Sequence, residues 1–549
     1  MFRDQGNNRY PTVHWFRHGL RLHDNPAMLE AVQGSTEFYA VFIFDGESAG
    51  TSHVGYNRMK FLLESLKDLD AQLRKHSGRL YMFKGNPTNV FRRLWEELGI
   101  KKICFEQDCE PIWSERDKSV VEMCSELGIE CVEKVSHTLW DPKLVIRTNG
   151  GIPPLTYQMF MHTTSVIGPP PRPCSDIDFT RVHFGVLPLY LCQELKVISD
   201  SPTPEDFGLE KEEGNKLVIW VGGETRALKH LESRVQTEQE ALASRILQAN
   251  QTQPNLLSAP TSQSAALRFG CLSIRRFYWT LRDLFNEMYE DMPSLSQSVT
   301  SQLIWREYFY TMSVDNPYYA EMERNPICLK INWLPRTDPT HQKKLDSWKN
   351  GMTGYPFIDA VMRQLRTEGW VHHVARNAVA CFLTRGDLWI SWEDGLKHFL
   401  KYLLDADWSV CAGNWMYVSS SAFEQLFDCT FCICPVSFGR RFDPYGEYVK
   451  RYVNEVRKLP VEYIYEPWTA SIEVQEQAGC VIGRDYPERI VDHNLVSREN
   501  STRMESIRKE LLTGMPHCCP TNTEELMKFM WLPPDLHKHI SKTVVDECQ

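Results

Sequence analysis

Two carboxylates and a thiol stand close together in the second half of the chain. Asp405 and Asp407 follow an apolar run at residues 399–404, and Cys411 lies four residues further on, among small residues. Acids at a helix C-terminus oppose the helix dipole, which favours a specific role over capping. Small neighbours would let a bulky group approach the Cys411 thiol closely. The plainer interpretation is a helix end followed by a buried cysteine.

A second polar stretch, residues 370–377, interrupts apolar sequence. His372 and Arg376 share one helix face, and His373 and Asn377 share the neighbouring face. A guanidinium in so apolar a helix needs a carboxylate partner. The stretch has no HExxH spacing, so it does not indicate a zinc protease. Paired histidines can also be ordinary core residues with satisfied hydrogen bonds.

Two further segments could hold a polar ligand. Ser262 and Ser264 precede an apolar helix start, where hydroxyls and free N–H groups can bind a phosphate. A plain N-cap is the alternative. Gln302, Arg306 and Tyr310 fall on one helix face through their i, i+4 spacing. Polar groups on a buried face require a polar ligand or partners within the protein.

Tryptophans are concentrated in the same half of the chain. Twelve of the 16 lie beyond residue 200. The spacing places Trp389 and Trp392 at i, i+3 on one predicted helix, and Trp333 and Trp415 lie nearby in the sequence. Core packing is the usual role of buried tryptophan. An electron relay is the alternative, because indoles can be oxidised.

Composition excludes several classes of protein. Lys plus Arg number 61 and Asp plus Glu 71, a net charge of −10 that makes a poor general binder of polyanions. Basic pairs at 440–441 and 450–451 leave weak DNA binding open. The apolar runs are too short for a membrane span, and the N-terminus has no hydrophobic signal region. Seventeen cysteines then indicate reduced, intracellular thiols.

No metal site is expected. The tightest cysteine group is Cys429, Cys432 and Cys434, and it lacks a second ligand pair at a zinc-like spacing.

Strands and helices alternate through residues 8–135. Continuous apolar strands separated by helices predict a doubly wound parallel sheet, without the GxGxxG of a dinucleotide site. The expected strands cover residues 13–16, 38–44, 80–83, 102–105 and 130–135, and the expected helices cover residues 58–74, 90–98 and 119–127.

The rest of the chain divides into three segments that differ in composition and periodicity. Residues 136–205, rich in Pro and Gly, predict a long connector over the surface. Residues 206–505 show helical periodicity and predict an all-α domain. Residues 506–549 predict a short tail, with an apolar spot at Phe529, Met530 and Trp531 that needs burial or a partner.

Taken together, these motifs resemble the photolyase/cryptochrome family. The resemblance runs from residues 14–26 to about residue 500, and it is most specific in residues 267–273, 302–307, 370–377 and 405–415. The likeness is greatest to the insect-type, light-sensing animal cryptochromes. It implies an α/β domain, a connector and a helical domain that holds FAD.

The resemblance also implies roles for individual residues. Ser262 and Ser264 would meet the FAD phosphates, Arg376 would pair with Asp405 beside the flavin ring, and Cys411 would face its N5 edge. The remaining lining of the flavin and its ribityl arm would come from Gln302, His373, Asp405, Ala406, Asp407 and Asn414. The inner, middle and outer relay tryptophans would be Trp415, Trp392 and Trp333, with Trp389 as a fourth.

The implied function is a blue-light photoreceptor of the circadian clock and not an enzyme. Light would drive an electron from Trp415 to the flavin. A buried Cys411 thiol is a poor proton donor, which predicts an anionic semiquinone stabilised by Arg376. The new charge would raise the pKa of His373 and release a tail docked through Phe529 and Trp531.

The partners and the location follow from the same resemblance. Tail release would expose a surface for clock proteins of the Timeless or Period type and for a ubiquitin ligase, in the cytoplasm and nucleus.

Two other functions stay open. A DNA photolyase would use the same flavin, but Asn377 stands where six-four enzymes have a second His. Cyclobutane enzymes have an acid at the position of Gln302 and a Trp at that of Tyr417. A light-independent transcriptional repressor of the vertebrate type would carry Asn at position 411.

The chain also departs from its relatives. Val221 replaces an Arg near the FAD phosphates, and Met530 replaces a tail Phe. Residues 334–345 form a longer segment than usual, which would shift Trp333.

Overall fold

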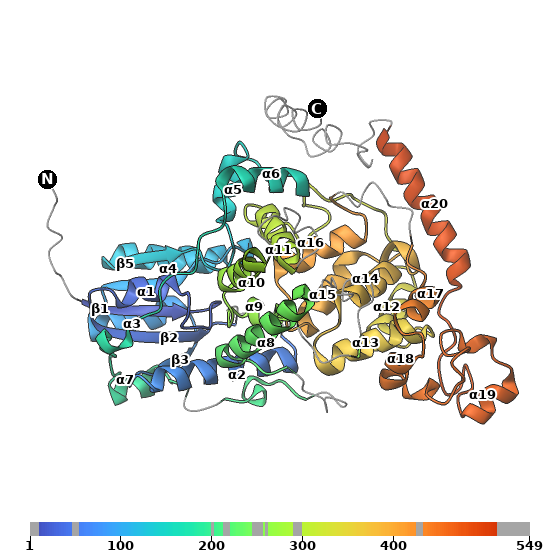
Figure 1. Ribbon diagram of the computed structural model, residues 1–549, viewed down its shortest axis with the longest axis horizontal. Helices are drawn as coiled ribbons and strands as arrows, with labels where there is room; N and C mark the ends of the chain where they lie inside the picture. The colour runs from blue at the N-terminus through green and yellow to red at the C-terminus, as the bar shows by residue number, and fades with distance from the viewer. Residues whose placement is uncertain are drawn as a thin grey trace.

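The computed structural model describes residues 10–46, 54–198, 202–211, 220–243, 256–257, 262–288, 299–423 and 432–512. Figure 1 shows an α/β half built on a sheet beside a larger helical half. Met530 and the expected tail residues Phe529 and Trp531 lie outside the described residues.

A five-stranded parallel sheet in the order β3-β2-β1-β4-β5 forms the α/β half. The strands are β1 (Tyr10–Phe16), β2 (Ser35–Phe44), β3 (Leu80–Lys84), β4 (Lys102–Glu106) and β5 (Glu130–Lys134). Its helices are α1 (Pro26–Val32), α2 (Tyr56–Arg74), α3 (Pro87–Leu98) and α4 (Ser114–Leu127). All five strands and the three helices expected from the sequence are confirmed.

Alternate side chains of each strand enter two separate cores. Val13 and Trp15 face a core within the α/β half, whereas Phe16 and Phe42 join a core that continues into the helical half. The continuous core ties the sheet to the helices and leaves little freedom between the two halves.

The connector is more ordered than a surface loop. It contains α5 (Pro142–Thr148), α6 (Tyr157–Ile167) and α7 (Leu189–Glu194). Leu139, Leu155 and Phe160 are buried, and the Tyr157 ring lies 4.1 Å from that of Trp305. The predicted position over the surface is therefore wrong for α5 and α6, because their apolar side chains join the core of the helical half, whereas α7 buries only Leu191, against the α/β half.

The remaining helices build the helical half. They are α8 (Glu224–Ala243), α9 (Ser264–Arg268), α10 (Ile274–Met288), α11 (Val299–Ser313), α12 (His341–Asn350), α13 (Pro356–Glu368), α14 (His373–Cys381), α15 (Trp392–Tyr402), α16 (Trp408–Val418), α17 (Pro435–Phe442), α18 (Glu447–Tyr452), α19 (Ile472–Ala478) and α20 (His493–Leu512). Helix α16 packs against α11, α14 and α15 and so lies at the centre of the arrangement.

One local prediction fails between α14 and α15. A π-helical turn, Phe382–Gly386, ends the first helix, and the Ser391 side chain caps the second by accepting from the Glu393 N–H. Trp389 lies between them with φ of +56°. The prediction that Trp389 and Trp392 share a helix is wrong, because the backbone leaves the helical conformation at Thr384 and Ser391 is the N-cap of a new helix.

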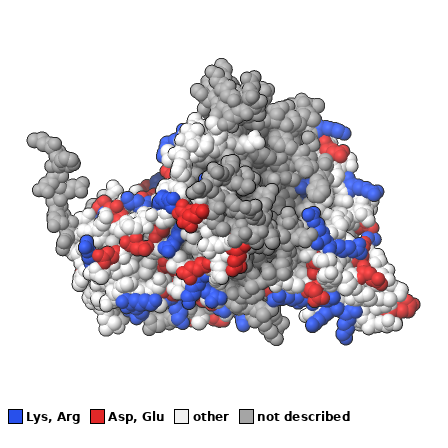
Figure 2. Space-filling view, viewed as in Figure 1, with Lys and Arg blue, Asp and Glu red and all other residues white. Residues whose placement is uncertain are grey.

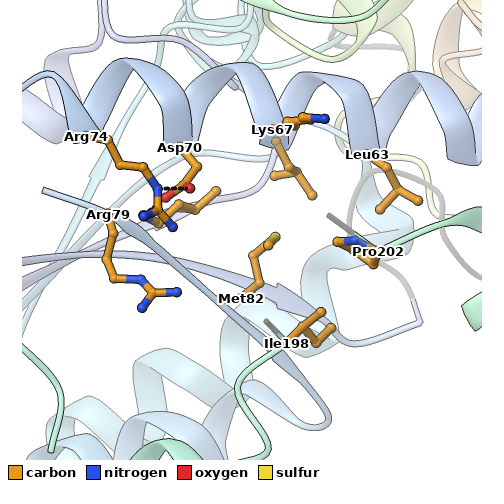
Figure 3. A pocket seen from close by; sticks show the side chains of 10 residues that line it. Leu63, Lys67, Asp70, Arg74, Arg79, Met82, Ile198 and Pro202 are labelled. Carbon is orange, nitrogen blue, oxygen red and sulfur yellow. Dashed lines mark hydrogen bonds and ion pairs between the residues drawn. The ribbon is translucent and has the colours of Figure 1, made fainter. Parts of the chain in front are cut away.

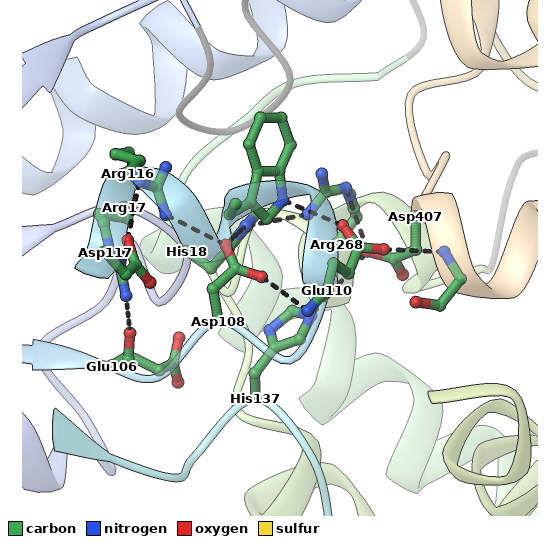
Figure 4. A network of polar contacts seen from close by, with 12 residues as sticks. Arg17, His18, Glu106, Asp108, Glu110, Arg116, Asp117, His137, Arg268 and Asp407 are labelled. Carbon is green, nitrogen blue, oxygen red and sulfur yellow. Dashed lines mark hydrogen bonds and ion pairs between the residues drawn. The ribbon is translucent and has the colours of Figure 1, made fainter. Parts of the chain in front are cut away.

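A buried network of charged groups joins the two halves at the carboxyl ends of β1 and β4 (Figure 4). Arg268 lies 3.1 Å from Asp407, and its guanidinium donates to His18 over 2.8 Å. His18 in turn contacts Asp108 at 3.0 Å. Glu110 accepts from the Ser409 N–H at the start of α16 over 2.9 Å. These contacts fix α16 against the sheet edge.

Loss of the Asp407 charge should destabilise the protein. Burial alone would raise the pKa of Asp407, but the adjacent Arg268 lowers it below the ordinary value of 3.8. Asp407→Asn leaves Arg268 buried without its counter-charge, and we expect the free energy of unfolding at pH 7 to fall by about 3–5 kcal/mol in denaturant titrations.

The pH dependence has a defined sign. A depressed carboxyl pKa stabilises the fold above pH 3.8 and loses that contribution as the pH falls below it. The Asp407→Asn protein should therefore show a flatter fall in stability from about pH 5 to 3. Asp283→Asn, which removes an exposed partner of Arg172, is the control and should cost less than about 1 kcal/mol. Equal losses in both variants would contradict the role of the network.

Candidate functional site

An ion pair between α14 and the segment before α16 marks the candidate site. The Arg376 guanidinium donates to Asp405 Oδ2 over 2.7 Å and to the Val371 carbonyl over 2.8 Å. The other carboxylate oxygen, Asp405 Oδ1, is buried without a hydrogen-bond partner among the described residues. A buried carboxylate oxygen left in this way is suited to accept from a bound polar group.

Asp405 and Asp407 point to opposite sides of the segment that joins α15 to α16. Asp405 reaches Arg376, whereas Asp407 enters the network with Arg268. Ala406 between them is 1% exposed, and its carbonyl accepts from both Arg58 and Arg268 over 2.9 Å. Of the two acids expected beside the flavin, the structure places the Asp405 carboxylate in the site and that of Asp407 at the interface.

Cys411 lies one turn into α16, 8% exposed. Burial, together with the nearby Asp405 carboxylate, raises the pKa of the Cys411 thiol to about 12. The thiol is therefore protonated at neutral pH and releases its proton poorly. The small neighbour Gly413 has a different use, because a β-carbon there would overlap the Phe309 ring of α11.

Three of the polar residues expected at the flavin keep accessible side chains on three helices that pack together. Gln302 on α11, His373 on α14 and Asn414 on α16 are exposed, and both α11 and α14 pack against α16. The surrounding protein, followed by the Arg376 charge, nevertheless lowers the pKa of His373 to about 4. His373 is therefore neutral at pH 7 and lies in the field of Arg376.

The two serines expected at the phosphates lie next to the same stretch. The Ser262 and Ser264 hydroxyls are 2.9 Å apart, and the Trp370 indole donates to Ser264 over 3.3 Å. This contact brings the start of α9 to the residues that precede α14. Helix α9 has only five residues, so hydroxyl groups rather than a long helix dipole would bind an anion there.

The polar face predicted on α11 has hydrogen-bond partners that the sequence did not reveal. Arg306 and Tyr310 both contact His137, at 2.8 and 2.9 Å, so this face finds its partners in the connector. His137 and Arg268 had not been recognised. Arg268 could have been found by its place between apolar neighbours, because a buried arginine requires an acid.

Four buried tryptophans lie in the helical half, on α16, at the start of α15 and in two loops. Trp392 is fully buried, and Trp415 packs where a side chain on Gly395 of α15 would otherwise lie. Trp333 and Trp389 are each 7% exposed, with ring centroids 4.9 Å apart. The positive φ of Trp389 costs about 1–3 kcal/mol for so large a residue, so tertiary contacts must hold it there.

A pocket in the α/β half is too small for a cofactor (Figure 3). It has a volume of about 40 Å³ between α2 and β3, lined in part by Lys67, Asp70 and Arg79. That volume suits a water molecule or two.

The described residues contain neither a metal-binding cluster nor a membrane-spanning helix. No cluster of three or more His, Cys, Asp or Glu residues suited to a metal occurs among them, and none of their helices is long and apolar enough to cross a membrane.

Comparison with known proteins agrees with this arrangement. Residues 299–506 match the family model for the FAD binding domain of DNA photolyase, and residues 12–175 match the DNA photolyase model. Cryptochrome-1 of Aedes aegypti is 56% identical over 95% of this chain and 98% of its own length. Cryptochrome-1 of Drosophila melanogaster is 54% identical, with the same coverage.

Solved structures share the fold as well. A class III photolyase from Agrobacterium tumefaciens superposes with a TM-score of 0.75 at 26% identity and covers 93% of this chain and 100% of its own. The family models cover both halves, and the insect relatives match nearly the whole chain. The chain belongs to the photolyase/cryptochrome family.

Proposed function

We propose that this protein is a blue-light photoreceptor of the circadian clock that uses FAD as its cofactor. The observation that carries the proposal is the set of four buried tryptophans, Trp333, Trp389, Trp392 and Trp415, in the same helical half as the Arg376–Asp405 pair and within the segment that matches the FAD-binding model. The insect relatives, which are named Cryptochrome-1, support the signalling function.

The residues present fit a flavin dinucleotide. Asp405 Oδ1 is buried without a hydrogen-bond partner among the described residues, and Gln302, His373 and Asn414 offer accessible polar groups on α11, α14 and α16. The hydroxyls of Ser262 and Ser264 would hold the phosphates. When bound, the cofactor absorbs blue light and accepts an electron.

Charge and proton control come from the chain itself. Arg376 is the positive group that would stabilise an added electron, although Asp405 already neutralises part of its charge. Cys411 holds its proton, and His373 is neutral in the dark. A new negative charge beside His373 would raise its pKa and favour proton uptake, which is a change that can be passed to a docked segment.

The electron would come from Trp415 and be replaced in turn from Trp392 and Trp333. Low exposure keeps water from the rings, and the indole N–H groups of Trp415 and Trp333 lack hydrogen-bond acceptors among the described residues, whereas that of Trp392 lies beside the Cys328 sulfur, a weak acceptor. Without a basic acceptor, an oxidised indole keeps its proton and the positive charge can move on.

The output of the photoreceptor would be protein binding. We expect release of the tail around Phe529 and Trp531 to expose a surface for clock proteins of the Timeless or Period type and for a ubiquitin ligase, in the cytoplasm and the nucleus. DNA repair is not the proposed activity. On the face in Figure 2, acidic and basic side chains are interspersed, as expected for weak DNA binding.

Absorbance before and during blue light tests the proposal. We expect the purified full-length protein to contain oxidised flavin that is reduced in the light. Trp415→Phe should slow photoreduction at least about tenfold by removing the first donor, whereas Trp408→Phe, at a buried site on the same helix, should not. Protein without flavin would favour the light-independent repressor. Repair of lesions in added DNA would favour photolyase.

Thiol labelling tests the dark state of Cys411. Burial alone would raise the pKa of Cys434, but hydrogen bonds from His493 and Ser437 lower it to about 6. Iodoacetamide at pH 8 should therefore label Cys434 at least about tenfold faster than Cys411, as measured by peptide mass spectrometry. Labelling of Cys411 at the rate of Cys434 would show that Cys411 is not a buried, protonated thiol.

A further inference from the structure

The outer tryptophan pair is held in a defined position. The Trp389 indole N–H donates to the Asn332 carbonyl over 2.9 Å, and the Trp389 carbonyl accepts from the Leu334 N–H over 2.8 Å. These two hydrogen bonds hold residues 332–334, which include Trp333, against Trp389 and maintain the strained backbone of Trp389. The geometry of the two rings is thus specified by the fold and not left to side-chain freedom.

A cation lies over the outer member of this pair. The guanidinium carbon of Arg503, on α20, is 5.2 Å from the centre of the Trp389 ring. Arg503 donates to Asn500 over 3.1 Å and, among the residues that the structure describes, makes no ion pair. Its charge is therefore not neutralised by a neighbouring carboxylate in this part of the chain.

Helix α20 is fixed on the segment that leads to Trp389. The Asn500 side chain donates to the Gly386 and Asp387 carbonyls over 3.2 and 3.4 Å, and His493 contacts Asp387 at 2.7 Å. Arg503 therefore remains beside Trp389 because the helix that carries it is docked there.

The charge of Arg503 acts differently on the two states of the ring. A guanidinium over a neutral indole is attracted by the π electrons. When Trp389 loses an electron, two positive charges face each other and the interaction becomes repulsive. At this separation the shift in the equilibrium is about fourfold with the full screening of bulk water and larger at the lower effective permittivity of a protein surface, so it is on the order of tenfold.

We propose that Arg503 shifts the light-generated positive charge from Trp389, the fourth tryptophan of the relay, toward Trp333 by opposing the oxidation of Trp389. This inference rests on the proposed function, which supplies the oxidised Trp333. In the step concerned, one electron passes from Trp389 to oxidised Trp333. Trp333 returns to its neutral form and Trp389 becomes a radical cation. No bond forms or breaks, and the Trp389 N–H proton stays hydrogen-bonded to the Asn332 carbonyl.

Neutralising Arg503 should lengthen the life of the separated charges. In Arg503→Gln the positive charge moves outward to Trp389, and recombination proceeds only through the fraction left on Trp333. Transient absorption of the flavin-loaded protein should then show a lifetime longer by about tenfold. Pulsed electron paramagnetic resonance should show a greater distance between the two radicals. Arg503→Lys should behave as the wild type.

A second substitution distinguishes an effect of the Arg503 charge on the Trp389 ring from a change in the structure of the protein. In a Trp389→Phe background, Arg503→Gln should leave the lifetime unchanged, because the ring that Arg503 controls is gone. Thermal unfolding of Arg503→Gln should match the wild type, since this side chain is exposed. If folding is impaired, Arg503→Met provides a second neutral variant for the same measurements.

The outcomes distinguish this inference from the proposed function. An unchanged lifetime in photoreducing Arg503→Gln overturns the inference alone, as does a lengthening that persists without Trp389 or that appears equally in Arg503→Lys. Absence of any light-induced radical in the wild type overturns the proposed function, and this inference with it.

Discussion

The buried ion pair between Arg268 and Asp407 is the interaction on which the site depends. Arg268 also donates to the Ala406 carbonyl, so one guanidinium holds both the side chain and the backbone of the segment before α16. This hold directs the neighbouring Asp405 toward Arg376. An ion pair removed from water is costly to break, so the segment that carries Asp405 is held in place.

The placement of the tryptophan rings is a second constraint, and it lowers the local stability of the backbone at two positions. Gly395 weakens α15 as a helix residue, but its missing side chain leaves room for Trp415. Trp389 adopts a backbone conformation that a large residue rarely takes, stabilised by contacts with residues 332–334 and with α20. At these two positions, tertiary contacts that place the rings override the local backbone preferences of glycine and tryptophan.

The electrostatics of the site are consistent with signalling by charge. A protonated thiol, a neutral histidine and an arginine that is already paired surround the place where an electron would arrive. None of these groups donates a proton readily at pH 7, so an added negative charge would persist and act on its neighbours. At the other end of the tryptophan series, the positive charge of Arg503, on the last described helix, lies over the Trp389 ring and opposes its oxidation.

The sequence by itself determined the parallel sheet, the helical domain and the need of Arg376 for an acid, because these follow from periodicity and from the cost of burying a charge. Motif resemblance added FAD and the tryptophan series. The spacing alone did not separate Asp405 from Asp407, although the resemblance assigned Asp405 to Arg376, and it did not show that Trp389 leaves the helix. The partners that decide both, Arg268 and the segment at residues 332–334, are distant along the chain. Only tertiary packing brings them into contact.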